Sequence, residues 1–437
     1  MKHKKLAYIG MVLVAALACT YVEAQPNTGD SFVKSESGHF TINGQPYYYI
    51  GANYWYAGLE ANDKAGKKRI AQELDFLQKQ GVNNLRVLAG GEGKGQINGV
   101  PRVEPALQTA PGKFNEKLLN GLDYLLVEMN KRNMKAVIYF SNNWEWSGGF
   151  LQYLNWNGLI SDSVLRRKLT WDEQRDYVAK FYSSDICIRQ YEQQVKLVLQ
   201  RVNKITGKKY VDDATIMAWE IANEPRPMRP SANEPYAKFL ANTAAMIKQI
   251  DSRHLLTIGN EGEMGTEDMP LFAAIHADKN IDYATIHIWP KNWGWFRDTS
   301  IAQSFGAVQQ RTAAYIDKHH TTMKSLGKPM VIEEFGLPRD SHSYKVESTT
   351  AFRDQYYGVI FEKLAVSAAA GGQIAGANFW TFSGKGRPSH KQLLWKKGDD
   401  VLGDPPVEEQ GLNSVFDCDA STWNIISAYA QKLTSKK

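Results

Sequence analysis

The sequence predicts an α/β protein and, within that class, a closed (β/α)8 barrel, a TIM barrel with helices outside a ring of parallel strands. Two patterns lead to this prediction. Eight short apolar runs alternate with stretches of helical periodicity, and polar or aromatic residues follow those runs at their C-terminal ends. The chain has 437 residues, of which 43% are hydrophobic and 22% charged, which is typical of a globular protein and sufficient for one barrel with long loops.

The predicted strands are apolar runs of strand length. They span residues 48–52, 84–88, 135–140, 216–221, 255–259, 283–288, 330–333 and 376–379. Helical periodicity separates them at 67–80, 116–132, 188–204, 236–250, 307–325 and 351–370, more weakly at 269–277, and returns in a closing helix at 423–433. Parallel strands need such crossovers to connect and cover them. Ahead of the first strand, Asn43-Gly44 predicts a hairpin turn.

An open, doubly wound sheet is the alternative arrangement of these elements. The glycine fingerprint expected after its first strand is missing from the chain. Gly90-Gly91-Glu92-Gly93 follows the second strand but lacks the Lys-Ser/Thr of a nucleotide-binding loop, so we interpret it as an ordinary flexible connection. The closed barrel is therefore the prediction.

The N-terminus has the pattern of an export signal. Three lysines within residues 1–5 precede an apolar run at 6–18, and Val22-Glu23-Ala24 offers a cleavage site. We therefore predict a signal peptide at 1–24, one catalytic domain at 25–437, and a secreted or periplasmic protein. A lipid anchor at Cys19 and a short buried helix are the alternatives. The sequence leaves open whether Cys187 and Cys418 pair.

Charge and motifs exclude several functions. The net charge of +6 falls to +4 without residues 1–24, which carry three Lys and one Glu, and the chain has no dense basic run, so no nucleic-acid partner is expected. HExxH, paired CxxC and GxSxG motifs are missing, and we expect His319-His320 to be solvated on a helix. We therefore predict no metal, no cofactor and no protein partner.

Two carboxylates at predicted strand ends indicate glycoside hydrolysis. Glu224 and Glu334 follow the fourth and seventh strands, and such an enzyme needs one protonated and one ionised carboxyl beside the scissile bond. Arg86 would keep one of them ionised. The other candidate substrate-binding residues at strand ends are Asn223, His287, Trp289, Trp380, Trp55, Asn143 and Trp144.

Neighbouring carboxylates need separate interpretations. Because side chains alternate along a strand, only one of Glu333 and Glu334 is expected to reach the site. Glu220 lies deeper in its strand and is expected to be a paired buried group. Glu234 repeats an Asn-Glu-Pro string but opens a helix, where Asn233 would act as the cap, so we interpret it as structural.

Tryptophan placement supports a carbohydrate substrate. Ten of the twelve Trp residues fall in predicted strand-end or loop segments, and a flat aromatic ring packs against the apolar face of a sugar. Trp380, at the end of the eighth strand, is the best stacking platform. About half of these residues are expected to fill the core beneath loops instead.

Several strings resemble glycoside hydrolase family 5, and within it the endo-β-1,4-mannanases. The two that resemble its acid/base and nucleophile motifs are Trp219–Arg226 (WEIANEPR) and Ile332–Gly336 (IEEFG). Further similar stretches are residues 51–58, 142–144, 212–217, 376–380, 403–406 and 416–417. The resemblance covers essentially the whole chain after residue 24.

The resemblance implies a retaining mechanism in which Glu224 is the general acid/base and Glu334 the nucleophile. It also implies that Arg86 and His287 lie beside them, that Asn223 binds the sugar 2-hydroxyl and that Trp380 floors the reacting subsite. Trp289 departs from the family pattern, which has a Tyr that hydrogen-bonds the nucleophile. An indole N–H can donate this bond but cannot titrate.

The predicted activity is endo-acting hydrolysis of β-1,4-mannosidic bonds in mannan, galactomannan or glucomannan. A β-1,4-glucanase and an exo-β-mannosidase share the fold and mechanism and stay open as alternatives. The long stretch from Trp144 to Asp185 is a candidate lid that would favour the exo alternative. A glycan-binding protein on a degenerate barrel is less favoured, because a binder has no need to keep Glu224, Glu334 and Arg86 together.

Overall fold

Eight parallel strands form the ring predicted from the sequence. The computed structural model describes residues 31–297 and 301–434, so the predicted signal peptide and Cys19 lie outside the described residues. The strands are β4 (Tyr49–Asn53), β5 (Asn84–Leu88), β10 (Lys135–Tyr139), β11 (Ile216–Glu220), β12 (Leu255–Thr257), β13 (Ala284–Ile288), β14 (Met330–Phe335) and β15 (Ile374–Phe379). All eight predicted strands are confirmed.

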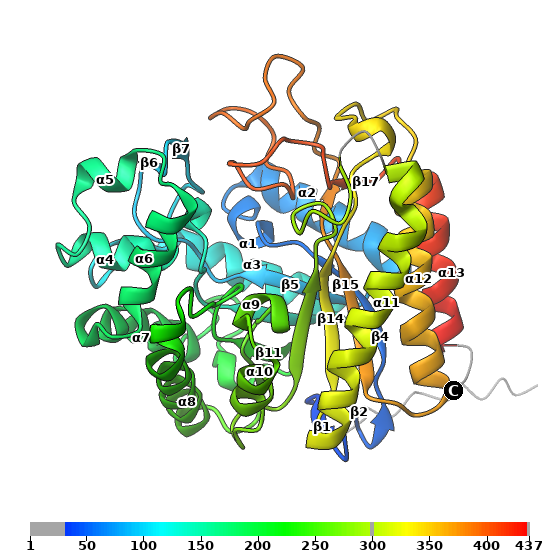
Figure 1. Cartoon of the computed structure of the whole chain (residues 1–437), viewed down its shortest axis with the longest axis horizontal. Helices are drawn as coiled ribbons and strands as arrows, with labels where there is room; N and C mark the ends of the chain where they lie inside the picture. The colour runs from blue at the N-terminus through cyan, green and yellow to red at the C-terminus, as the bar shows by residue number, and fades with distance from the viewer. Residues whose placement is uncertain (1–30, 298–300, 435–437) are drawn as a thin grey trace, which may run out of the picture. The chain divides into compact units, whose positions relative to one another are not determined.

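The strands are paired in the order β12-β11-β10-β5-β4-β15-β14-β13. Hydrogen bonds close the ring between the first and last of these: Asp282 N donates to Leu256 O over 2.8 Å, and His287 N donates to Glu261 O over 3.1 Å. The architecture is therefore the (β/α)8 barrel and not the open sheet, and its strand ends meet on one face (Figure 1).

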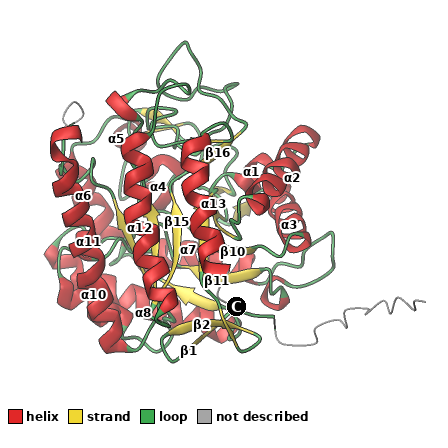
Figure 2. Cartoon of the chain, turned by 90° about the vertical axis from the view of Figure 1, so that its right-hand side faces the viewer, coloured by secondary structure: helices red, strands yellow, loops and turns green. Residues whose placement is uncertain are grey.

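Helices surround the strands (Figure 2). The main covering helices are α2 (Lys64–Lys79), α3 (Glu116–Lys131), α7 (Asp185–Leu199), α8 (Asn233–Ile250), α10 (Met269–His276), α11 (Ile301–Leu326), α12 (Ala351–Ala369) and α13 (Ala420–Thr434). Asp63 and Asn115 cap α2 and α3 through their side chains, which explains where these helices begin. Short helices α1 (Ala57–Glu60), α9 (Glu263–Thr266), η2 (Tyr210–Asp212), η3 (Pro230–Ala232) and η4 (Asp340–His342) occupy the connections.

Two helix boundaries differ from the sequence prediction. The predicted helix at 188–204 ends at Leu199, because Asn203 Oδ1 accepts the Ile205 main-chain N–H over 2.9 Å and makes a local turn that competes with the helix. At α8, Ala232 occupies the capping position without a side-chain bond, and Asn233 is already helical, so the predicted Asn cap was wrong. Glu234 lies in the first turn of α8 and does not line the catalytic pocket described below.

The N-terminal end of the barrel is closed by apolar packing. The hairpin predicted at Asn43-Gly44 joins β2 (His39–Ile42) to β3 (Gln45–Pro46), and β1 (Lys34–Glu36) pairs with β2. Val33 and Phe40 from this region pack against buried strand residues, including Tyr49, Val137 and Val331. The site must therefore lie at the opposite end.

The candidate lid is a helical unit packed onto the barrel. Residues 144–185 contain η1 (Glu145–Ser147), α4 (Gly149–Trp156), α5 (Asp162–Arg166) and α6 (Trp171–Phe181), which Figure 1 shows beside β6 (Gln96–Ile97) and β7 (Val100–Pro101). Phe150 and Phe181 stack at 4.2 Å, and both contact Phe239 of α8. This buried aromatic contact anchors the unit, and only its edge reaches the site.

Further short elements lie in the loops. They are β8 (Gln108–Ala110), β9 (Lys113–Phe114), β16 (Phe382–Gly384) and β17 (Val415–Phe416). The long segment between β16 and β17 lies over the C-terminal face of the barrel (Figure 1). Cys187 and Cys418 are both free, the first buried and the second exposed. Within the described ranges, no helix is long and apolar enough to cross a membrane.

Candidate active site

Arg86 on β5 holds the centre of the site. Its guanidinium is fully buried and pairs with both oxygens of Glu220, at 2.8 and 2.5 Å. Its Nη1 donates to Glu334, and its Nη2 donates to Asn223 Oδ1 over 2.8 Å. A planar guanidinium suits this role because it presents several donors in fixed directions. Glu220 is therefore the paired buried carboxylate that the sequence predicted.

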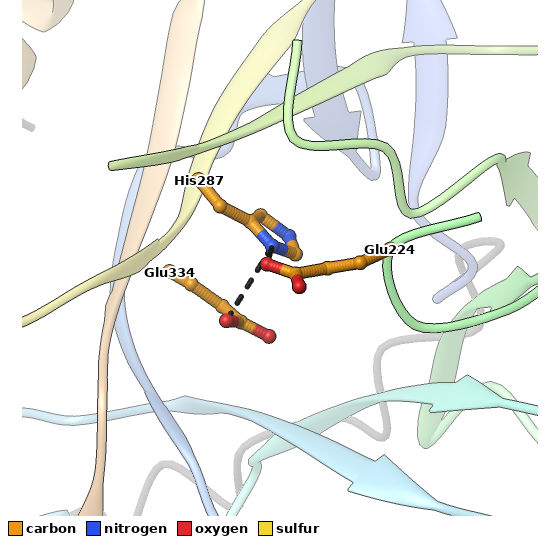
Figure 3. Close-up of side chains that lie close together, drawn as sticks. All are labelled: Glu224, His287 and Glu334. Atoms are coloured by element: carbon orange, nitrogen blue, oxygen red, sulfur yellow. Dashed lines mark hydrogen bonds and ion pairs between the residues drawn. The ribbon is translucent and has the colours of Figure 1, made fainter. Parts of the chain in front are cut away.

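Glu224 and Glu334 face one another across the end of the barrel. One oxygen of each, together with a ring nitrogen of His287, forms a group whose atoms lie within 4.8 Å of one another (Figure 3). Retaining glycosidases place their carboxyl groups about 5–5.5 Å apart, whereas inverting enzymes need about 6.5–9.5 Å for a water molecule. The close approach therefore fits a retaining pair.

The turn after β11 aims Glu224 into the site. Glu224 has a left-handed backbone, with φ +51°, which is unusual for a residue other than glycine and occurs at functional sites. Its N–H donates to Gly259 O over 2.9 Å. A Cβ on Gly259 would lie 2.1 Å from Ala222 O and 2.2 Å from Glu220 Oε1, so only glycine fits beside this turn.

Three hydrogen-bonding side chains orient the carboxyl pair. His287 Nδ1 lies 2.6 Å from Glu224 Oε1 and 3.4 Å from Glu334 Oε2, so one ring nitrogen approaches both carboxyl groups (Figure 3). The Trp144 indole donates to Glu224 Oε2, and the Trp289 indole donates to Glu334 Oε2 over 3.3 Å. Trp289 thus donates to Glu334, the predicted nucleophile, where the resemblance leads one to expect a Tyr.

Burial raises the pKa of both Glu224 and Glu334, and their mutual repulsion raises that of Glu334 further. The two groups titrate as a pair. The Arg86 ion pair lowers the cost of a negative charge on Glu334, whereas Arg226, the cation that most lowers the pKa of Glu224, is engaged by both oxygens of Glu261. The contact with Arg86 therefore favours the negative charge of the pair on Glu334.

The state of His287 fits this assignment. Burial lowers the pKa of His287, so the imidazole is neutral and has one donor and one acceptor nitrogen. Nε2 lies 3.4 Å from Glu333 Oε2, and Nδ1 faces Glu224. A proton on Nε2 directed at Glu333 leaves Nδ1 free to accept the hydrogen bond of a protonated Glu224.

Of Glu333 and Glu334, only Glu334 lines the pocket described below, as expected, but Glu333 also enters the buried cluster around Arg86, which alternation did not predict. Glu333 Oε2 lies 3.4 Å from Arg86 Nε and from His287 Nε2, so both carboxylates contact the same cluster. The reason is a register shift: Ile286 pairs with Ile332, but the next residue, His287, pairs with Glu334. The extra residue in β14 breaks the alternation of side chains, which a β-bulge does and a sequence pattern does not reveal.

A pocket of about 630 Å3 opens beside the carboxyl pair. Six tryptophans line it: Trp144, Trp146, Trp171, Trp289, Trp293 and Trp380. Trp380 and Trp289 meet edge to face, with ring centroids 5.9 Å apart, and the buried Trp380 indole N–H has no partner in the described structure. Aromatic walls with a few free polar atoms suit a sugar chain.

Four predicted substrate-binding residues do not line this pocket: Arg86 and His287, which are fully buried and contact the carboxyl pair, and Trp55 and Asn143. Trp55 is buried, and its indole donates to Gly403 O over 2.5 Å, so it fixes the segment between β16 and β17. Asn143 is also buried, and its side-chain oxygen accepts the Arg226 main-chain N–H over 3.4 Å. Asn223 lines the pocket, although Arg86 and Asn142 already engage its amide.

Two further expectations need correction. His319 is buried, with Nε2 accepting the Glu263 N–H over 2.8 Å and Nδ1 directed at Tyr315 O, because its helix face packs on the α9 turn and not on solvent. The Gly90–Gly93 segment is also buried. A Cβ on Gly91 would lie 2.4 Å from Ser147 O, so close backbone packing explains these glycines, not an open flexible loop.

The structure adds site residues that the sequence argument missed. Arg226 lies 5.0 Å from the Trp144 ring centroid and is paired with Glu261, so it holds that indole from one side. Glu408 lines the pocket from the segment between β16 and β17, and burial raises its pKa to about 8. Arg226 follows the acid/base motif directly, which is a usable signal. Glu408 lies in an aperiodic loop and has none.

Comparison with known proteins agrees with the motifs and the geometry. The family model described as GH family 5 beta-mannosidase-like matches residues 30–437. The chain belongs to this family. Among family 5 structures, it is similar to the mannosidase from Rhizomucor miehei, with 33% identity, a TM-score of 0.83, and coverage of 93% of this chain and 98% of the other.

Curated plant sequences are similar as well. Mannan endo-1,4-beta-mannosidase 4 of Solanum lycopersicum is 32% identical, covering 83% of this chain and 86% of its own length. Mannan endo-1,4-beta-mannosidase 7 of Arabidopsis thaliana is 29% identical, covering 97% and 90%. The chain therefore spans nearly the whole of these relatives, and its barrel is that of family 5 glycoside hydrolases.

Proposed function

We propose that the protein is an endo-acting, retaining β-1,4-mannanase that hydrolyses internal bonds of mannan, galactomannan or glucomannan. The observation that carries the mechanism is the close approach of Glu224 and Glu334 with Arg86 paired to Glu334. The names of the plant relatives support the mannan substrate.

The geometry assigns a role to each group. Glu334, kept ionised by Arg86, attacks the anomeric carbon while Glu224 donates its proton to the leaving glycosidic oxygen. The glycosyl-enzyme ester is then hydrolysed by water that gives its proton to Glu224, which restores the acid. His287 accepts a hydrogen bond from Glu224 before proton transfer, and the Trp144 indole stabilises the carboxylate formed afterwards.

An exposed aromatic residue supports binding of a longer chain. Trp171 lines the pocket, remains 47% exposed, and lies 6.1 Å from the Trp144 ring centroid at an interplanar angle of 29°. Trp144 donates to Glu224, which would protonate the leaving group, so Trp144 lies on the leaving-group side of the pocket. Trp171, next to Trp144, lies further along that side. A second sugar could pack there, which an endo-acting enzyme needs.

An exo-β-mannosidase is the second candidate. The observation that favours it is the segment between β16 and β17, which brings Glu408 and Asn413 into the pocket and so narrows one side of it. The high similarity to the structure titled a family 5 mannosidase points in the same direction. Product size separates the two candidates.

The test is a time course on soluble galactomannan, glucomannan and a β-glucan, with Glu334→Ala as the control. Early manno-oligosaccharides from both mannans, formed as β-anomers and absent with the variant, would support the proposal. Release of mannose alone would establish the exo candidate, and cleavage of only the β-glucan would contradict the substrate. Binding without cleavage would contradict an enzymatic role.

We also propose that the protein acts outside the cytoplasm, supported by the lysine-rich and apolar pattern of residues 1–24. N-terminal sequencing of the protein recovered from the growth medium or periplasm tests this. A mature chain beginning at Gln25 is expected. A chain with a lipid on Cys19 would show an anchored protein instead, and an intact Met1 in the cytoplasm would contradict export.

A further inference from the structure

Glu92, on the loop after β5, is a buried carboxylate that the mechanism above does not use. Its side chain is completely buried and accepts hydrogen bonds on both oxygens. Oε1 accepts from Ser141 Oγ and Gln194 Nε2, both over 2.8 Å, and from Tyr153 Oη over 3.3 Å, while Oε2 accepts from Gly149 N over 2.9 Å. Burying such a group is costly unless donors surround it, so this arrangement is a specific feature of the structure.

Two of the four donors to the Glu92 carboxylate, Ser141 and Gly149, lie at the two ends of one turn. Ser141 follows β10 and Gly149 begins α4, and the Glu92 main-chain N–H donates to Ser147 O over 2.7 Å within the same turn. At Gly148, with φ +103°, a Cβ would lie 2.1 Å from Glu92 O. The segment 141–149 therefore packs closely on the Glu92 loop. Hydrogen bonds to the Glu92 carboxylate hold it there, and we call this arrangement the clamp.

This turn carries the groups that contact the acid/base. Asn142 Oδ1 accepts from the Trp144 main-chain N–H and from Asn223 Nδ2, each over 3.0 Å. The Trp144 indole in turn donates to Glu224. Hydrogen bonds at Ser141, Gly149 and Trp144, joined by the covalent chain of the turn, thus connect Glu92 to Glu224.

We propose that Glu92 is a positioning residue: it clamps the turn 141–149 so that the Trp144 indole stays on Glu224 and sets the protonation of the acid. The reading of Glu224 as acid/base rests on the proposed function, whereas the clamp itself rests on the geometry. Burial raises the pKa of Glu92 to about 7, which is consistent with a carboxylate held by neutral donors.

A test must separate an effect on Glu92 from a direct effect on Glu224, so the charged and titratable groups around each of these carboxylates matter. Those facing Glu92 are Tyr153 of α4, Tyr191 of α7 and Arg102, whose Nη1 donates to the Glu92 main-chain oxygen over 2.9 Å. Those facing Glu224 are Arg86, Glu220, Arg226, Glu261, His287, Glu334 and Glu408. No residue belongs to both sets, so a change at Glu92 reaches Glu224 through the turn.

The decisive variant is Glu92→Gln. It keeps the shape of the side chain but places an amide N–H2 group opposite a neighbouring donor, so that two donors face one another. The loosened turn moves the Trp144 indole away from Glu224 and breaks the hydrogen bond between them. Because this hydrogen bond lowers the pKa of Glu224, its loss raises the pKa of Glu224. We expect the alkaline limb of kcat/KM to move to higher pH on an aryl β-mannoside, with kcat about tenfold lower and KM within about twofold of wild type.

Trp144→Phe should move the limb in the same direction, and the double variant should add no further shift, because both changes act through one bond. Glu128→Gln, which alters an ion pair on α3, is the matched control and should leave the profile unchanged. A folded Glu92→Gln with an unmoved limb, or a double variant with additive shifts, would overturn the proposal.

Two measurements keep this test separate from folding and from the proposed function. If Glu92→Gln does not fold, Ser141→Ala and Tyr153→Phe each remove one donor and should give smaller shifts in the same direction, and no shift would overturn the clamp. The Glu224 carboxyl can also be titrated directly by carbon NMR, assigned with Glu224→Gln. A wild type that cleaves no β-mannoside refutes the proposed function, whereas a Glu224 titration unchanged by Glu92→Gln refutes this inference.

Discussion

The two ends of the barrel are built from the same strands and have opposite chemistry. At the N-terminal end, β11 contributes Met217 to an apolar cluster, and three residues later it contributes Glu220 to the buried ion pairs of Arg86. Apolar burial stabilises the first end. At the second, several carboxylates share few cations, which costs stability and is kept for chemistry. The barrel thus separates the region that holds the fold from the region that performs the reaction.

Removing the central cation should have the largest effect. Arg86→Ala leaves Glu220, Glu333 and Glu334 buried without their cation, so we expect kcat to fall on the order of 10³-fold or more and the free energy of unfolding to fall by about 3–5 kcal/mol. Arg86→Lys keeps the charge but loses the fork of donors and should recover stability more than activity. Activity assays and denaturant unfolding measure both, and a folded, active Arg86→Ala would contradict the role of this end.

The opposite end should respond in stability alone. Leu255→Ala removes a buried side chain from the apolar cluster, so the free energy of unfolding should fall by about 2–4 kcal/mol. Activity per folded molecule should stay within about twofold of wild type, because no substrate group lies there. A large loss of kcat in the folded variant would show that the two ends are coupled and not separate.

Trp289→Phe tests the hydrogen bond to Glu334 at the charged end of the barrel. The change removes the N–H that donates to Glu334 and keeps an aromatic wall, so kcat/KM should fall about tenfold. Loss of a donor to the ionised nucleophile raises its pKa, so the acid limb of the pH profile should move to higher pH. Trp289→Tyr restores a donor and should shift the limb less. An acid limb at the same pH in the wild type, Trp289→Phe and Trp289→Tyr would contradict a hydrogen bond from Trp289 to the nucleophile.

The smallest effect should come from the rim of the pocket. Trp171→Ala should raise KM for mannohexaose by about threefold to tenfold with little change in kcat, because one stacking surface is lost. An aryl β-mannoside, too short to reach Trp171, serves as the control and should show no change. Equal effects on both substrates would place the residue in folding, not in binding of longer chains.

The sequence predicted the regular parts of the molecule well because they depend on local patterns. Strand length, helical period and residues at strand ends identified all eight strands and placed Glu224, Glu334, Arg86 and His287 on one face. The sequence prediction failed where tertiary packing overrode a local pattern. The bulge in β14 brought Glu333 into the cluster, and the buried environments of His319 and Glu92 have no local signature.

The sequence by itself determined the barrel and the family and pointed to Glu224 and Glu334 as the proposed catalytic pair, because alternating apolar periods and two strand-end motifs are properties of the chain read in order. Only the tertiary structure decided which carboxyl of the pair Arg86 contacts, which tryptophans line the pocket, and how the turn 141–149 connects Glu92 to Glu224. Those outcomes depend on distances between segments remote in sequence and on the burial that raises each carboxyl pKa. Both quantities arise only when the strands close the ring.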